Sequence, residues 1–316
     1  MRDSIVVLTG GTGSFGQGFV RLLLQQPDVK MVRIFSRNEH SQRAMLSWCP
    51  PDRVSFYIGD IRDRDRLRRA MDGAHVVVHA AALKQAPLGE VEGGEFIRTN
   101  VIGSENVIEA ARDCHLEKAL LISSDKAVEP LNLYGGTKML AEKLFLQADR
   151  MRGTFPTRFA CTRYGNVAGT AGSVIPMFLG LKPGEPTPIT DPECTRFWIS
   201  LEDANNFVLW AVRNMRGGEV FIPRSPAVRL ADLATAIRPG EPIKIIGLRA
   251  GEKKHEVLNI EGERYSSESS RSLTIPEIRT AVFGKDEAPS QAVGERCVVA
   301  PDPADAGRQP DPIQAA

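Results

Sequence analysis

The sequence is poor in cysteine and histidine, and neither residue occurs in a spacing typical of metal sites. Five cysteines are scattered along 316 residues with no C-x-x-C pair, and the five histidines include no H-E-x-x-H pattern. An odd number of isolated cysteines supports neither a disulfide framework nor a zinc site. We therefore expect reduced cysteines and no bound metal.

Long apolar runs and a surplus of one charge are also missing. Forty basic and 39 acidic residues leave a formal net charge of +1. No apolar run approaches the roughly 20 residues of a membrane-spanning helix. Because a strand-like run opens already at Ile5, we expect no signal peptide. The arginine-rich stretch 62–69 therefore predicts a solvated helix face, not nucleic-acid binding. We expect a soluble, cytoplasmic protein with no membrane or nucleic-acid partner.

Short apolar runs alternate with helical segments up to about residue 165. The strand-like runs are 5–8, 31–35, 54–58, 75–79 and 119–123. This alternation is typical of an α/β fold with a parallel sheet and right-handed crossovers. We predict a Rossmann-type, doubly wound parallel sheet in residues 1–165, to which later segments can return.

The alternation of strand-like and helical segments ends after residue 165, where prolines and glycines break the chain into short elements. We predict a smaller C-terminal lobe, mainly for substrate binding, over residues 166–283, with a helix at 201–215 and strands at 219–222 and 243–246. Residues 284–316 are rich in Pro, Ala, Asp and Gln and hold few large apolar groups. They predict a disordered or loosely attached tail.

A glycine-rich turn follows the first strand-like run and opens a helix. It reads TGGTGSFG over residues 9–16. Glycines at 10, 13 and 16 permit a tight turn, a close approach of a pyrophosphate to backbone N–H groups, and close packing of helix on strand. The context disfavours a purely structural turn. We predict a dinucleotide site formed by Gly10, Thr12, Gly13, Ser14, Phe15 and Gly16.

The end of the second strand indicates which dinucleotide. Ser36-Arg37-Asn38 stands where an NAD enzyme usually has an acidic residue for the ribose 2′-hydroxyl. A hydroxyl and a guanidinium suit a 2′-phosphate, so NADP is favoured, although a solvated loop arginine is the alternative. Because the ligand of a doubly wound sheet lies across the carboxyl ends of the strands, later strand ends also contribute. We assign Asp60 and Ile61 to the adenine and Ala80, Ala81 and Ala82 to the middle of the cofactor.

The stretch 123–138 holds a nearly complete set of oxidoreductase groups. Tyr134 and Lys138 are four residues apart, on one helix face, so the ammonium can lower the phenol pKa and make Tyr134 a general base. Ser124 can hydrogen-bond the substrate oxygen from which Tyr134 would take a proton. Asp125 and Lys126 add an acid and an amine beside this trio.

Seven strings in the same order resemble the inverting UDP-N-acetylglucosamine 4,6-dehydratases, which are extended short-chain dehydrogenases/reductases. They are AALKQAP (81–87), TNVIG (99–103), SSDKA (123–127), NLYG (132–135), RYGNV (163–167), TRFWI (195–199) and GEKKHE (251–256). The resemblance covers residues 3 to about 260. It implies a lyase with bound NADP, a UDP-N-acetylglucosamine substrate, a role in polysaccharide biosynthesis and a homo-oligomer.

The resemblance also implies a role for each residue. Tyr134, with Lys138 and Ser124, would take the C4 hydroxyl proton. Lys126, its pKa lowered by burial and by Lys138, would take the C5 proton as a neutral amine, and protonated Asp125 would release the C6 hydroxyl as water. The product would be UDP-2-acetamido-2,6-dideoxy-β-L-arabino-hexos-4-ulose. Asn100 and Lys84 are assigned to the cofactor, and the substrate contacts expected are Lys84, Asn166, Ser173, Val174, Arg196, Arg249 and Glu252.

Three other functions remain open. A retaining dehydratase would share the chemistry, but such enzymes carry an Asp-Glu pair where this chain has Asp125-Lys126. A UDP-sugar 4-epimerase shares the Tyr and Lys but has no use for an acid and an amine at C5 and C6. A non-catalytic, NADP-sensing scaffold of the same fold needs none of these groups.

Overall fold

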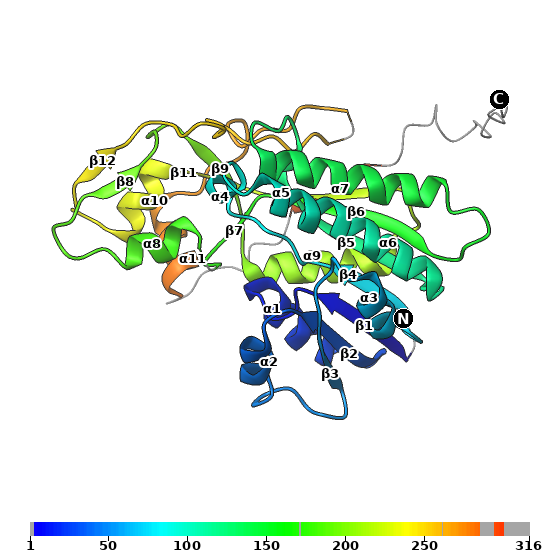
Figure 1. The fold of residues 1–316 in the computed structure, drawn as a ribbon. Helices are drawn as coiled ribbons and strands as arrows, with labels where there is room; N and C mark the ends of the chain where they lie inside the picture. The colour runs from blue at the N-terminus through cyan, green and yellow to red at the C-terminus, as the bar shows by residue number, and fades with distance from the viewer. Residues whose placement is uncertain (1–2, 171, 261, 285–293, 300–316) are drawn as a thin grey trace.

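The computed structural model describes residues 3–170, 172–260, 262–284 and 294–299 (Figure 1). Its strands are β1 (Ser4–Thr9), β2 (Val29–Ser36), β3 (Val54–Ile58), β4 (Val76–His79), β5 (Lys118–Ser124), β6 (Arg158–Tyr164), β7 (Asn166–Val167), β8 (Thr187–Ile189), β9 (Thr195–Ile199), β10 (Val220–Arg224), β11 (Ala227–Arg229), β12 (Ile243–Ile245) and β13 (Gly294–Val299).

The helices follow the predicted alternation. The α-helices are α1 (Ser14–Leu24), α2 (Glu39–Met45), α3 (Arg64–Met71), α4 (Ala86–Gly89), α5 (Gly93–Phe96), α6 (Gly103–Asp113), α7 (Leu133–Arg150), α8 (Val174–Leu179), α9 (Leu201–Asn214), α10 (Leu230–Ile237) and α11 (Ile275–Phe283). A π-helix, η1 (Ile97–Ile102), joins α5 to α6, and a 3₁₀ turn, η2 (Asp125–Ala127), follows β5. No helix in the described part of the chain is long and apolar enough to cross a membrane.

The main sheet has the strand order β13-β10-β6-β5-β4-β1-β2-β3. Every neighbouring pair from β10 to β3 is parallel, so the predicted α/β doubly wound fold is confirmed. The later strand β10 does return to the sheet beside β6. The chain therefore aligns the carboxyl ends of β1 to β6 along one edge, where ligands of such sheets bind.

Alternating side chains along the strands build two cores. In β1, Val6 and Leu8 face the core that α1 and α9 cover, whereas Val7 faces the core that α3, α6 and α7 cover. This alternation follows from the two-residue period of a strand. Both faces of the sheet are covered, which explains why the strands read as continuous apolar runs.

A second group of elements lies to one side of the main sheet, on the left of Figure 1. It contains two small sheets, with orders β11-β9-β7 and β12-β8. Helices α8, α10 and α11 pack with them around a third core that includes Phe178, Trp198 and Leu233. The strand β7 begins two residues after β6 ends, so the chain passes directly from the main sheet into this group.

The tail prediction was wrong for one segment. Gly294–Val299 form β13, which pairs antiparallel with β10. The pairing satisfies backbone hydrogen bonds along that strand, which the polar composition of the wider segment does not reveal. The rest of the predicted tail, apart from Gly284, lies outside the described residues.

Candidate active site

A cavity of about 640 Å³ runs along the carboxyl ends of the strands. The glycine-rich turn forms one end of it, with Gly10, Thr12, Gly13, Ser14, Phe15 and Gly16 all on the wall, as predicted for a ligand site. Gly10 has a φ of +70°, and a Cβ on it would lie 2.9 Å from the Ala81 Cα. A Cβ on Gly16 would lie 2.5 Å from the Gly11 Cα. Only glycine fits these two positions.

The end of β2 forms the far wall of the cavity. Ser36, Arg37 and Asn38 line it together with Asp60 and Ile61. The Arg37 Nη1 lies 3.6 Å from the Asp60 Oδ2, and Arg37 is more than half exposed. Burial raises the pKa of Asp60, but hydrogen bonds and charge from Arg62, with the charge of Arg37, hold that pKa below its ordinary value.

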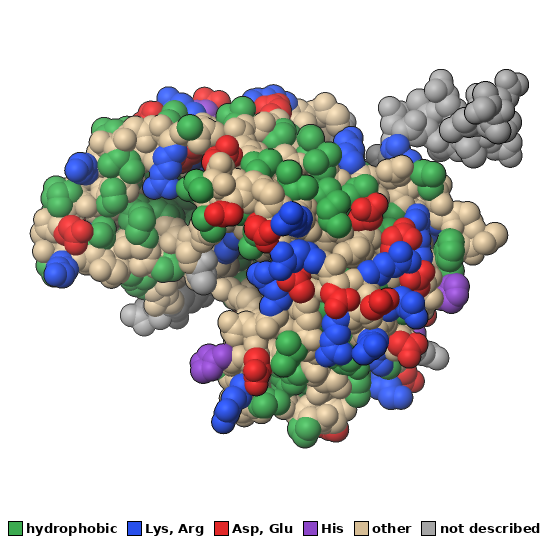
Figure 2. Space-filling view, viewed as in Figure 1, with side chains coloured by type: hydrophobic (Ala, Val, Ile, Leu, Met, Phe, Trp, Pro, Cys, Tyr) green, Lys and Arg blue, Asp and Glu red, His purple; other side chains and the backbone are tan. Residues whose placement is uncertain are grey.

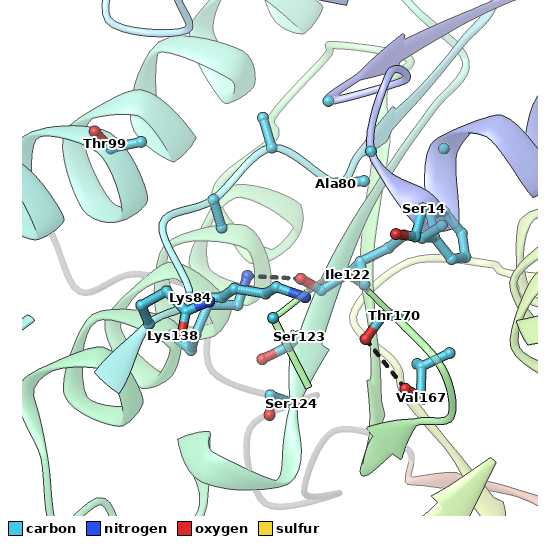
Figure 3. Close-up of a pocket in the computed structure, with 18 of the residues that line it drawn as sticks. Ser14, Ala80, Lys84, Thr99, Ile122, Ser123, Ser124, Lys138, Val167 and Thr170 are labelled. Carbon is cyan, nitrogen blue, oxygen red and sulfur yellow. Dashed lines mark hydrogen bonds between the residues drawn. The ribbon is translucent and has the colours of Figure 1, made fainter. Parts of the chain in front are cut away.

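The middle of the cavity is lined by Ala80, Ala81, Ala82 and Lys84 (Figure 3). Burial lowers the pKa of the Lys84 amine. Asn100 is not on the wall. Its side chain lies behind it, where the amide accepts from the Leu83 N–H at 2.8 Å and donates to the Leu83 carbonyl at 2.9 Å. Asn100 therefore holds the loop that carries Lys84 and does not face the cavity.

Two caps place the predicted catalytic groups. The Ser124 Oγ accepts from the Lys126 N–H at 3.3 Å, which starts the turn η2 directly after β5. The Asn132 Oδ1 accepts from the Gly135 N–H at 2.8 Å and caps α7. Tyr134 and Lys138 then lie on the buried side of α7, and both line the cavity beside Ser124.

The expected effect of Lys138 on Tyr134 is not found. The Lys138 Nζ donates to the Ile122 carbonyl at 2.6 Å, as the dashed line in Figure 3 shows, and burial lowers the pKa of this amine to about 8. Burial raises the pKa of the Tyr134 phenol, while Lys126 and a hydrogen bond from Ser124 act in the lowering direction. The cation that favours the Tyr134 phenolate here is thus Lys126.

Lys126 is held by three oxygens from three parts of the chain. Its Nζ lies 3.0 Å from the Asp125 Oδ1, 3.1 Å from the Asn166 Oδ1 and 3.2 Å from the Glu256 Oε1. Burial lowers the pKa of Lys126, but the negative charges of Asp125 and Glu256 outweigh it and raise that pKa. The prediction of a lowered pKa was wrong, because two carboxyls surround the amine and Lys138 contacts a carbonyl instead.

Asp125 is fully buried beneath the cavity wall. Burial raises its pKa and the charge of Glu256 adds to this, against the opposing effect of Lys126. The pKa of Asp125 is thus shifted in the direction that a protonated acid needs. The Ser124 Oγ donates to the Asp125 Oδ1 at 2.8 Å and itself lines the cavity. Ser124 and Lys126 thus connect this acid to the cavity.

The predicted substrate contacts divide between two cavities. Lys84, Asn166 and Ser173 line the large one. A second cavity of about 230 Å³ is lined by Arg196, Arg249 and Glu252, and Lys126 borders both. Val174, which begins α8, lines neither cavity.

The Arg196 guanidinium already has protein partners, so it is less available to a phosphate than an unpaired arginine. Its Nη1 donates to the carbonyls of Thr195 and Lys254, and its Nη2 lies 2.7 Å from the Glu252 Oε1. The guanidinium forms part of the wall of the second cavity and is almost fully buried. Arg249 belongs to an exposed loop at the same cavity.

Glu256 is a site residue that the sequence patterns did not predict. It ends the GEKKHE string, which marked the resemblance, but nothing in that string shows that its carboxylate reaches Lys126. Among the described residues no cluster of His, Cys, Asp or Glu could hold a metal ion, and the four cysteines whose side chains are described are free.

A comparison with known families places the chain. The family model described as polysaccharide biosynthesis protein matches residues 6–277. The chain belongs to this family. It is 46% identical over 255 residues to an inverting UDP-N-acetylglucosamine 4,6-dehydratase of Campylobacter jejuni, covering 80% of this chain and 76% of that one. The resemblance to the inverting dehydratases is confirmed.

Other relatives carry a different name. A UDP-glucose 4-epimerase of Rickettsia canadensis is 43% identical over 264 residues, which cover 81% of this chain and 77% of that protein. Among solved structures, Pen from Bacillus thuringiensis superposes with a TM-score of 0.84 at 31% identity, over 90% of this chain and 99% of that one. These relatives support an enzyme acting on a nucleotide sugar. The choice between dehydration and epimerisation rests on the residues of the site.

Proposed function

We propose that this chain is an NADP-dependent 4,6-dehydratase that converts UDP-N-acetylglucosamine with inversion at C5. One observation carries the proposal. The pair Asp125 and Lys126 adjoins Tyr134 and Ser124, with the Lys126 amine on the cavity wall. An epimerase shares the tyrosine and Lys138 but has no use for an acid and an amine at C5 and C6. An acid and an amine are needed when a C5 proton and a C6 hydroxyl must also leave.

The cavity has the features of a dinucleotide site. A Cβ on Gly10 or Gly16 would collide with the backbone of Ala81 or Gly11, so the tight turn that would bring backbone N–H groups to a pyrophosphate needs glycine at both positions. Ser36 and Arg37 stand at the end of β2, where they would bind a 2′-phosphate. When bound, NADP⁺ would accept a hydride from C4 of the sugar and return it to C6.

The first proton transfer falls to Tyr134. Its phenolate would take the C4 hydroxyl proton, and the Ser124 hydroxyl would hydrogen-bond the same oxygen. Burial opposes formation of that phenolate, so a nearby cation must favour it. The charged Lys126 provides this effect before it acts as a base, with Lys138 beside the site.

The second stage falls to Lys126 and Asp125. A ketone at C4 makes the C5 hydrogen acidic, and Lys126, once its ammonium has released a proton to solvent in the cavity that it lines, would take the C5 proton as a neutral amine. Protonated Asp125 would supply the proton with which the C6 hydroxyl leaves as water, and the Ser124 hydroxyl would be its contact with the cavity. Return of a proton to the opposite face of C5 would give UDP-2-acetamido-2,6-dideoxy-β-L-arabino-hexos-4-ulose.

The two groups of polar side chains suggest how the substrate would lie. Lys84, Asn166 and Ser173 are proposed to contact the sugar nucleotide from the large cavity. Arg196, Arg249 and Glu252 are proposed to contact it from the second cavity. A homo-oligomer in the cytoplasm stays a prediction.

Incubation with UDP-N-acetylglucosamine in deuterated water, followed by NMR of the product, tests the proposal. We expect a 4-keto-6-deoxy sugar with deuterium at C5 and an inverted C5 configuration. Retention at C5 would remove inversion but leave dehydration. Recovery of the C4 epimer alone, as the name of the Rickettsia relative suggests, would refute dehydration. Cofactor binding with no change in any sugar would favour the NADP-sensing scaffold.

A further inference from the structure

Glu256 is a buried carboxylate that meets the site from a distant part of the sequence. The bridge between Thr195 and His255 places this segment beside β9. The Glu256 N–H donates to the Ser267 Oγ, and the Glu256 carbonyl accepts from the Ser267 N–H, both at 2.9 Å. The backbone of Glu256 is therefore held on both sides, and its side chain is only 4% exposed.

Both carboxylate oxygens of Glu256 face amines. Oε1 lies 3.2 Å from the Lys126 Nζ, and Oε2 lies 3.6 Å from the Lys253 Nζ. Oε2 has no hydrogen-bond partner within the described structure. Lys253 also donates to the Val128 carbonyl, so its ammonium is shared. The positive charge of Arg196 acts on Glu256 as well, although that guanidinium is engaged by Glu252.

The groups that face Lys126 come from every element around it. Asp125 lies in η2, Tyr134 in α7, Asn166 in β7 and Arg196 in β9. Within the described residues, Asp125 has no hydrogen-bonded cation other than Lys126, and its Oδ2 has no hydrogen-bond partner. When buried carboxyls compete for one cation, the carboxyl with fewer other cations nearby more readily keeps its proton, and here that carboxyl is Asp125. Glu256, with Lys253 and Arg196 nearby, is the one that stays ionised.

We propose that Glu256 is a positioning residue that holds the Lys126 amine at the junction of the two cavities and sets how many protons the Asp125–Lys126 pair binds. Its negative charge keeps the proton on Asp125, where an acid is needed, and retains the ammonium on Lys126 at neutral pH. Protons of such interacting groups belong to the cluster, not to one residue. The catalytic meaning of this control rests on the proposed dehydration, but the electrostatic relationship does not.

Chemical labelling of Lys126 tests the relationship without any turnover. The folded protein is acylated with a trace of acetic anhydride over a pH series, and mass spectrometry measures the label on the Lys126 peptide. In Glu256→Gln the amine loses a neighbouring charge, and such a charge shifts a pKa by about 1 to 3 units. We expect labelling at a fixed pH to rise about 10-fold. Equal labelling of the variant and the parent would overturn the proposal.

Glu268→Gln is the matched control. Glu268 lies in the same region and faces His255 at 3.7 Å, but it is mostly exposed and makes no contact with Lys126. We expect its labelling profile to follow the parent. Glu256→Asp keeps the charge on a shorter side chain and should restore most of the parent profile. An Asp variant that labels like the Gln variant would show that loss of packing, not charge, is responsible.

A second variant covers the case in which Glu256→Gln does not fold. Lys253→Met removes the competing cation, so that Glu256 acts on Lys126 alone. We expect labelling of Lys126 to fall below the parent value at every pH. Unchanged or increased labelling of Lys126 would contradict the proposal, just as equal labelling of Glu256→Gln and the parent would.

The consequence for catalysis is read separately, as the pH profile of C5 hydrogen exchange with UDP-N-acetylglucosamine. The rising limb for a neutral amine should move to lower pH in Glu256→Gln. A lower rate with an unmoved limb would indicate a merely structural role. Absence of exchange in the parent would refute the proposed function, while the labelling result would still decide the role of Glu256.

Discussion

The Lys126 Nζ lies 3.1 Å from the Asn166 Oδ1, across the gap between η2 and β7. This contact joins the end of the main sheet to the first strand of the second group of elements. It places the amine on the wall shared by both cavities. Because Asn166 comes directly from the loop that ends β6, any shift between the two groups would move the amine.

Two variants should separate the half-reactions. Tyr134→Phe removes the group that takes the C4 proton, so no reduced nicotinamide should form on mixing with substrate. Lys126→Ala should slow hydride transfer from C4, because it removes the cation that favours the Tyr134 phenolate, and should block loss of the C5 proton. The measurements are nicotinamide absorbance in a single turnover and C5 exchange into deuterated water. If Lys126→Ala exchanges C5 hydrogen at the parent rate, another group is the base.

Cofactor preference should depend on Arg37. A charge-assisted contact to a 2′-phosphate contributes roughly 1.5 to 3 kcal/mol, which is about 10-fold to 100-fold in affinity. Arg37→Asp should reverse the preference from NADP to NAD, since the new carboxylate repels a phosphate and accepts from a ribose hydroxyl. Titration of the stripped protein with each cofactor measures the change. A parent that prefers NAD, together with an unaffected variant, would show that β2 does not select the cofactor.

Acid stability should depend on His79. Its ring is buried between the Thr9 Oγ1 at 2.7 Å and the Ser104 Oγ at 3.1 Å. Burial, assisted by the charge of Lys138, lowers its pKa to about 3. Below about pH 6.5 the unfolded chain therefore binds a proton on His79 that the folded chain does not bind. Stability then falls as the pH drops from about 6.5 toward the pKa of His79 in the folded protein.

The expected loss is about 1.4 kcal/mol of unfolding free energy per pH unit in that window. Urea unfolding at pH 7, 6 and 5 measures it. His79→Gln keeps polar contacts with Thr9 and Ser104 but cannot be protonated, so its stability should depend less on pH. An equal slope for parent and variant would mean that other groups govern the acid limit.

Two glycine-to-alanine substitutions should have different effects, one lowering cofactor affinity and the other raising stability. Gly16→Ala places a Cβ 2.5 Å from the Gly11 backbone, so the turn must open and cofactor affinity should fall by at least about 10-fold. Gly136→Ala, within α7, meets nothing within 4 Å. It should raise stability by about 0.5 to 1 kcal/mol, because alanine is the better helix former. Thermal unfolding and cofactor titration are measured for both variants. An equal change in cofactor affinity for Gly16→Ala and Gly136→Ala would contradict the steric explanation.

The local features of this protein follow from its residue order alone. Apolar runs of strand length, the glycine turn before α1 and the four-residue spacing of Tyr134 and Lys138 depend on backbone geometry within a few residues. The parallel sheet and the glycine-rich end of the cavity were predictable for that reason. Gly16 is required by the chain around it, since its Cβ would meet Gly11, whereas Gly10 is also required by the close approach of Ala81.

Only the tertiary structure decided the charge state of the site. The pKa of Lys126 depends on Glu256, which reaches it from the segment beside β9, and on burial that no local pattern reports. The edge strand β13 likewise depends on a partner, β10, far along the chain. Coulomb energies change with a few ångströms of separation and with the surrounding dielectric. They are therefore set by the residues that the fold brings close together, and not by the order of residues in the sequence.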